Sequence, residues 1–335
     1  IEIALQGVLV KTRDWNVTAG FNINFNRGKV DKLADNVTGL YGTEWATSST
    51  FPKSDYVLKE GRPVGLVRGL TADGFYTTDD FTYENGVYTL KEGVADVSSA
   101  VFPNYHLHNG INERPAGQLA YPGMAKFKDL NDDGIINDDD VDVIGDMTPV
   151  HTGGFNINAT YKNFDLGLYF NWSYGNEIYN VNKLAALYGY KEGAVYENKL
   201  SIVKDCYKIY DVVNGELVAL TTPEQLNAAN ANAKLPLAYS ENGYVSTLGI
   251  EDGSYLRLNT LTLGYTLPKS ILQKAGISNL RVYGSIYNVF TITGYSGIDA
   301  EVSTSTSTKT YPQLGMDWGT YPRARSFVLG VNLSF

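Results

Sequence analysis

Strict alternation of apolar and polar residues over long stretches is the feature that most constrains this chain. At positions 15–26, every odd position is apolar and every even position is polar or glycine. A β-strand points successive side chains to opposite faces, so this stretch has one apolar and one polar face. Strands in soluble sheets are about 5 or 6 residues long, whereas a membrane-crossing strand needs roughly 9 to 11. The stretch therefore predicts a membrane strand with one face toward lipid and one toward water.

The same pattern recurs often enough to predict about seven strands, at 1–10, 15–25, 155–161, 164–174, 255–267, 280–292 and 327–335. Short connections at 11–14, 162–163 and 268–278 alternate with long ones at about 28–150, 176–253 and 293–321. Bacterial barrels have short periplasmic turns and long extracellular loops, so the long connections are expected outside the cell. A soluble β-sandwich explains neither the strand length nor this alternation. The predicted fold class is all-β, a transmembrane antiparallel β-barrel with long extracellular loops.

An open sheet of seven strands would leave unpaired backbone groups in lipid, so the remaining strands are expected from sequence upstream of this chain. The chain also opens directly in a predicted strand, without a signal peptide. We therefore interpret it as a fragment of a longer exported protein. No apolar run approaches the roughly 18 to 20 residues of a membrane-spanning helix.

Composition supports this interpretation and excludes other classes. Charged residues make up only 19% of the chain, whereas soluble proteins carry about 25%, and a lipid-facing surface needs few charges. The net charge is −9, with no basic run, which argues against a nucleic-acid partner. Cys206 is the only cysteine, so no internal disulfide exists, and we expect it to be a buried or loop residue.

Residues 129–140 match the twelve-residue calcium loop. Calcium prefers six to eight oxygen ligands, and a glycine at the sixth position allows the sharp turn that lets one loop supply them. Gly134 occupies that position, and Asp140 stands at the twelfth, where Glu is usual. The alternative is an Asx-rich turn without an ion. The expected structural Ca²⁺ ligands are Asp129, Asn131, Asp133, Ile135 through its carbonyl, Asn137 and Asp140.

No catalytic constellation is recognisable, so no enzymatic activity is expected. The chain contains no G-x-S-x-G, H-E-x-x-H or P-loop motif. His106 and His108 would share one strand face, but no third metal ligand lies near them in sequence. Aromatic residues in the long connections either stack on a ligand, pack the connections together or form the outer aromatic girdle. They include Tyr41, Trp45, Tyr105, Tyr188, Tyr311, Trp318 and Tyr321.

Several short motifs occur in a fixed order along nearly the whole chain. They are the acidic segment 129–134 with Ile144-Gly145 and Pro149, then 161–166, 251–258, 263–268, 280–283, 288–293, 297–301 and Tyr321-Pro322-Arg323 before the terminal Phe335. In this order and spacing they resemble the SusC/RagA family of TonB-dependent transporters. Ala300 stands where that family usually has Pro, which alters a loop only.

The resemblance implies a 22-stranded barrel with an N-terminal plug. Residues 1–335 would be the C-terminal seven or so strands, with the plug domain and N-terminus absent, and 28–150 would be an extracellular loop region containing the calcium loop. The implied location is the outer membrane, surrounded by its lipid. Phe335 resembles the terminal signal read by the barrel-assembly machinery.

The resemblance also implies an activity and partners. Such proteins import oligosaccharides or peptides with energy from TonB, which contacts the missing N-terminal region. They pair with a SusD-like surface lipoprotein that acts as a lid, commonly in a dimer of transporter–lipoprotein pairs. Two alternatives stay open: a passive porin or structural barrel, and a surface adhesin or binding module. The substrate-binding residues are not predictable from this sequence.

Overall fold

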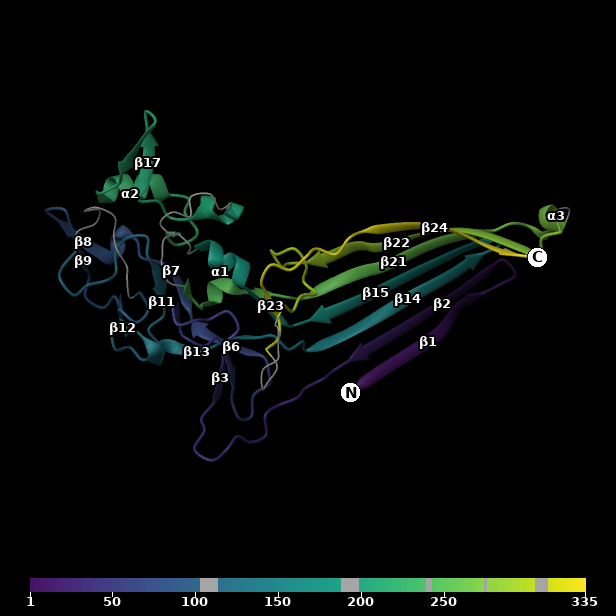
Figure 1. Ribbon diagram of the computed structural model, residues 1–335, viewed down its shortest axis with the longest axis horizontal. Coiled ribbons are helices and arrows are strands. Elements are labelled where there is room, and N and C mark those ends of the chain that lie inside the picture. Colours follow the sequence, from purple (N-terminus) through teal and green to yellow (C-terminus); the bar gives the residue numbers. More distant parts are fainter. Residues whose placement is uncertain (103–113, 188–198, 239–242, 274–275, 305–312) are drawn as a thin grey trace.

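Seven long strands form one continuous antiparallel sheet, here called the wall (Figure 1). The computed structural model describes residues 1–102, 114–187, 199–238, 243–273, 276–304 and 313–335. The wall strands follow one another in chain order across the sheet and agree with the seven expected from sequence. They are β1 (Glu2–Lys11), β2 (Trp15–Asn24), β14 (His151–Tyr161), β15 (Phe164–Tyr174), β21 (Tyr255–Thr266), β22 (Asn279–Thr293) and β24 (Ser326–Ser334).

The register of the wall gathers the apolar residues on one face. Phe21 lies opposite Leu5 on one side and Phe155 on the other, and Phe155 lies opposite Phe170. The rings of Phe155 and Phe170 stack with their centroids 4.3 Å apart. The two-residue period therefore extends across strands as well as along them, as one continuous apolar surface. This is the all-β architecture of a barrel wall.

The short and long connections lie at opposite ends of the wall (Figure 1). The three short ones join β1 to β2, β14 to β15 and β21 to β22; the last contains α3 (Lys269–Leu272). The three long ones follow β2, β15 and β22 and meet beyond the other end. We call these the first, second and third connections, and their folded assembly the body.

The body is built from many short elements. The first connection contains β3 (Leu40–Gly42), β4 (Thr50–Phe51), β5 (Tyr56–Leu58), β6 (Leu66–Leu70), β7 (Ala72–Phe75), η1 (Thr78–Asp80), β8 (Phe81–Glu84), β9 (Val87–Leu90), β10 (Asp96–Val97), β11 (Ala125–Phe127), β12 (Ile135–Ile136), η2 (Asp138–Asp140) and β13 (Val141–Asp146). The second contains β16 (Glu177–Asn180), α1 (Val181–Leu187), η3 (Ser201–Asp205), β17 (Tyr210–Val213), β18 (Glu216–Ala219), α2 (Pro223–Asn230), β19 (Gly243–Tyr244), η4 (Thr247–Gly249) and β20 (Ile250–Asp252), and the third contains β23 (Met316–Asp317).

The main hydrophobic core lies in the body. Its fully buried members include Tyr76, Tyr121, Tyr179 and Leu184, and every residue of this cluster belongs to one of the three connections. The wall contributes none of them. The three connections pool their apolar residues into this shared interior.

Backbone pairing between connections joins the body into one unit. Strand β19 of the second connection pairs in parallel with β4 of the first. Strand β16 of the second pairs in parallel with β23 of the third. The Tyr56 hydroxyl also donates to the Leu314 carbonyl at 2.7 Å, which joins the first connection to the third. None of these contacts is local in sequence, so the body depends on the wall to bring its parts together.

Helices are few and short in the described part of the chain. Helix α2 includes the first residues of the Asn- and Ala-rich tract at 227–233. Thr222 caps this helix by accepting a hydrogen bond from the Gln225 backbone N–H, and Pro223 occupies its first turn. Within the residues that the structure describes, no helix has both the length and the apolar character needed to span a membrane.

Candidate functional site

The polar face of the wall carries a hydrogen-bonded network of amide and hydroxyl groups. The Asn158 side chain donates to Asn156 Oδ1 at 3.1 Å, and the Tyr169 hydroxyl donates to Asn158 Oδ1 at 3.1 Å. Nearer the body, the Asn259 amide donates to Asn171 Oδ1 at 2.7 Å. Such groups exchange readily with water and with polar solutes. This face therefore suits a wet passage, whereas the opposite face suits lipid.

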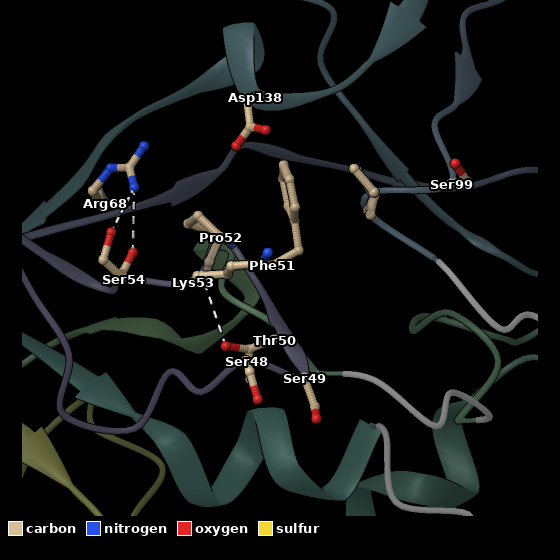
Figure 2. Close-up of a pocket in the computed structure, with 12 residues that line it drawn as sticks. Ser48, Ser49, Thr50, Phe51, Pro52, Lys53, Ser54, Arg68, Ser99 and Asp138 are labelled. Atoms are coloured by element: carbon tan, nitrogen blue, oxygen red, sulfur yellow. Dashed lines mark hydrogen bonds between the residues drawn. The ribbon is translucent and has the colours of Figure 1, made fainter.

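Residues of the first connection line a recess in the body (Figure 2). Its volume is about 430 Å³, within the range of sites for small molecules. Hydroxyl groups dominate the polar part of the lining, together with two cations and one carboxylate. The lining residues are Ser48, Ser49, Thr50, Phe51, Pro52, Lys53, Ser54, Arg68, Ser99, Ala100, Val101 and Asp138.

Arg68 is a partly buried cation of this recess. Its Nη1 donates to Ser54 Oγ at 2.8 Å, as Figure 2 shows, and its guanidinium lies 4.8 Å from the centre of the Tyr41 ring. Burial lowers the pKa of Arg68, opposed by Tyr41 and Asp138. The arrangement offers hydrogen bonds and charge but no activated nucleophile. It can bind a polar ligand.

No motif in the sequence predicts this recess. The signal available was the run of hydroxyl residues at 47–50, directly before Phe51 and Pro52. Such a run also describes an ordinary surface loop. Only the folding of η2 and β6 beside it shows that the run borders a cavity with Arg68 and Asp138.

The predicted calcium loop closes on itself through backbone N–H groups. Asp129 Oδ2 accepts from the Gly134 N–H at 2.7 Å, and the Asp133 N–H lies 3.3 Å from Asp129 Oδ1 and 3.2 Å from Asn131 Oδ1. Gly134 has a φ of +85°, the left-handed conformation that favours glycine at the sixth position. Asp129, Asn131 and Asp133 therefore lie close together at the start of the loop.

The second half of the loop is held differently. Asp140 is fully buried and accepts from the Leu130 N–H at 2.7 Å and the Asn137 N–H at 2.8 Å. The Asn137 amide donates to the Ile135 carbonyl oxygen, at 3.1 Å. Asp140 thus ties the two ends of the loop together. Within the described residues, no three Asp, Glu, His or Cys side chains gather as a metal-binding cluster. The first half of the loop has the oxygen-bearing side chains and the glycine turn of the calcium pattern.

The remaining residues singled out in the sequence fall into four groups. Trp45 packs into the body, its ring centroid 6.3 Å from that of Tyr179. Tyr41, Trp318 and Tyr321 are exposed, Tyr321 by 88%. Cys206 is buried, and burial raises the pKa of its thiol to about 11, so it is inert near neutral pH. The others lie outside the described residues: Tyr105, His106, His108, Tyr188 and Tyr311.

A partly buried glutamate joins the second connection to the third close to the wall. Glu251 in β20 accepts from the Ser296 N–H and hydroxyl, both at 2.9 Å, and pairs with Lys183 at 3.2 Å. Burial raises the pKa of Glu251, but the Ser296 hydrogen bonds and the Lys183 charge outweigh it and hold the pKa below its ordinary value. The ionised carboxylate therefore stabilises the body.

Replacing this carboxylate should make the stability of the body less dependent on pH. Because the folded-state pKa of Glu251 is depressed, its contribution is present above the unfolded value of about 4.5 and is lost as the pH falls through the folded value. We expect Glu251→Gln to lower the free energy of unfolding by about 1–3 kcal/mol at pH 7, and the difference from the parent to shrink on acidification. Thermal unfolding of the intact protein at several pH values measures this. Glu216→Gln, at an exposed hairpin position, is the control; a constant difference at all pH values would contradict the assignment.

The chain is similar in sequence to known proteins named TonB-dependent receptors. No family model matches the chain. It is 29% identical over 339 residues to the TonB-dependent receptor P3 of Formosa agariphila, and the match covers 100% of this chain and 28% of that protein. It is 25% identical to the TonB-dependent receptor SusC of Bacteroides thetaiotaomicron, covering 100% of this chain and 26% of SusC. The chain thus spans less than a third of the length of these relatives. Their names are those of receptors, in agreement with the prediction that the chain is not an enzyme.

The fold has a match among solved structures. The structure of the RagAB peptide transporter superposes with a TM-score of 0.64 at 21% identity, covering 100% of this chain and 29% of the matched one. At this identity the likeness establishes the fold. Wall and body together are therefore a known arrangement.

Proposed function

The chain is SusC/RagA-like in sequence and fold, and from this premise we propose that it forms part of an outer-membrane importer powered through TonB. The carrying observation is its similarity, over its whole length, to proteins named TonB-dependent receptors. The two-faced wall supports the proposal because a channel wall needs one lipid-facing and one wet surface. In this proposal the chain is the C-terminal part of the barrel, and a plug and the TonB-contacting segment belong to the same longer protein.

The proposed mechanism assigns no bond chemistry to these residues. The wall is the rigid frame, and the body covers its outer opening. The recess in the body offers hydroxyl groups, Lys53, Arg68 and Asp138 to the cargo. A SusD-like surface lipoprotein closes over the body as a lid, and two such pairs form a dimer. Oligosaccharides are the first proposed cargo, because the recess is rich in hydroxyl groups that bond to sugars. Peptides are the second, since a solved structure of similar fold is that of a peptide transporter.

Growth experiments test this function. Deletion of the gene should abolish growth on one oligosaccharide or peptide mixture and leave growth on monosaccharides or free amino acids unchanged. Deletion of tonB should give the same phenotype. A passive porin predicts uptake that persists without TonB, and an adhesin predicts no growth defect on any nutrient. Co-purification of a surface lipoprotein with the tagged protein tests the partner.

We also propose that residues 129–140 bind a structural Ca²⁺ that braces the first connection. The support is the oxygen donors of Asp129, Asn131 and Asp133 beside the positive-φ Gly134. Added Ca²⁺ should raise the midpoint of thermal unfolding of the intact protein by mass action, and a chelator should reverse the effect. Asp129→Ala should abolish the response. Asp139→Ala, at a non-ligand position of the same loop, should keep it; an equal response in both variants would contradict the site.

A further inference from the structure

A slot opens where the wall meets the third connection. Strand β22 continues to Thr293, but its pairing with β24 ends at Tyr287 and Ser326. Beyond that point the segment 322–325 runs beside β22, held by the Asn288 side chain, which donates to the Ala324 carbonyl at 2.8 Å. A cavity of about 240 Å³ lies between them. Its lining includes Arg257, Thr291, Ile298, Pro322, Arg323 and Arg325.

Arg257 lies in the lining of the slot as a buried cation. It is the only charged residue of β21, and its side chain is 3% exposed. Its Nη2 binds Asp299 and its Nε donates to Thr291 Oγ1 at 3.0 Å. Its Nη1 lies 3.2 Å from Glu301 Oε2 but has no hydrogen-bond partner of acceptable geometry among the described residues. A buried guanidinium N–H without a hydrogen bond is costly, so an acceptor from outside would stabilise it.

The charges around the slot leave one cation in excess. Arg323 Nε lies 3.3 Å from Asp299 Oδ2, and its Nη1 lies 3.2 Å from Glu301 Oε2. Asp299 and Glu301 are thus both shared between Arg257 and Arg323. Arg325 has no carboxylate partner among the residues that the structure describes, and its Nε reaches only the Asn288 carbonyl, at 3.4 Å.

We propose that this slot binds the carboxylate of an acidic cargo molecule. A guanidinium presents paired N–H groups that match the two oxygens of a carboxylate, and the excess positive charge selects an anion. Ile298 and Pro322 add apolar surface for the carbon body that carries the acid. The identification of the ligand as cargo rests on the import function proposed above. A peptide C-terminus and a uronic acid share this chemistry, and experiment separates them.

Binding to the purified full-length protein tests the slot directly. Trialanine with a free C-terminus is compared with its amide, and digalacturonate with neutral maltose, by calorimetry at low ionic strength. In at least one of the two pairs, peptide or sugar, the acid should bind. Its neutral counterpart should bind at least tenfold more weakly. Arg325→Gln should weaken that binding roughly tenfold to a hundredfold, and Arg325→Lys should restore part of it. Arg13→Gln, an exposed arginine in a short connection, is the control.

Each outcome of these binding experiments either supports or contradicts the carboxylate site. If neither acid binds better than its neutral counterpart, or if Arg325→Gln binds the acid as the parent does, the slot is not a carboxylate site. Because binding is measured without transport, it can hold even if the growth experiments disprove import. Conversely, import of a neutral nutrient can proceed when the slot proposal fails.

Discussion

Leu261→Arg is expected to remove most of the folded protein from the outer membrane. Leu261 lies near the middle of β21 on the apolar face, opposite Leu168 on one side and Ile286 on the other. An arginine near the bilayer midplane of a barrel costs about 2–4 kcal/mol. Heat-modifiable migration on gels measures the folded fraction in outer-membrane preparations of cells that produce the full-length protein.

The control for this prediction is the neighbouring residue. Thr260→Arg places the same side chain on the polar face, in the row of Tyr169 and Tyr287. Because that face is wet in the proposed barrel, we expect near-normal amounts of folded protein. Equal loss in both variants would mean that the two faces do not differ in environment, and the assignment of the wall to a membrane would fail.

Gly69→Ala is expected to unfold the body and leave the wall in place. A Cβ at this position would lie 2.4 Å from the Val245 carbonyl oxygen, a backbone atom that cannot move aside cheaply. The adjacent Leu70 N–H donates to the same carbonyl at 2.9 Å, so separation of the two segments also breaks this bond. Overpacking of this kind costs about 1–3 kcal/mol or more. Protease treatment of intact cells should then cleave the connections at temperatures that the parent withstands.

Gly28→Ala provides the matched comparison, because no heavy atom would lie within 4 Å of the added carbon. This variant should resist protease as the parent does. Protease resistance of Gly69→Ala equal to that of the parent would show that the first and second connections do not approach this closely.

The strands of the wall were predictable from sequence because the pattern that defines them involves only residues that are neighbours in the chain. The alternation at positions 15–26 needs only the two-residue period of a strand, and the structure confirms that strand as β2 (Trp15–Asn24). Turn chemistry added the hairpin at 162–163, where Lys162 adopts a φ of +51°. These signals predicted the seven strands and the hairpins between them, and the structure adds their order across the sheet.

The body was not predictable in the same way, because its strands are short and its contacts are remote. Strand β4 has two residues, and its partner β19 lies almost two hundred positions along the chain. Nothing in the sequence around Thr50 indicates this pairing. The Arg257–Asp299 contact is similar, although a single charge in a strand of membrane length was a usable signal for a buried partner. The candidate ligand residues of the calcium loop were named from the sequence, and both their role and the binding of Ca²⁺ stay predictions.

The pairing of β4 with β19 and of β16 with β23 has a consequence for biogenesis. The segments that make up the body are separated in the chain by hairpins of the wall, and these hairpins must first align side by side. Contacts of such large sequence separation form slowly, because the intervening chain loses conformational entropy before the contacts contribute any stabilising free energy. The body should therefore fold last, after the wall has inserted into the membrane. A newly made molecule would pass through a stage with a complete wall and an unfolded body.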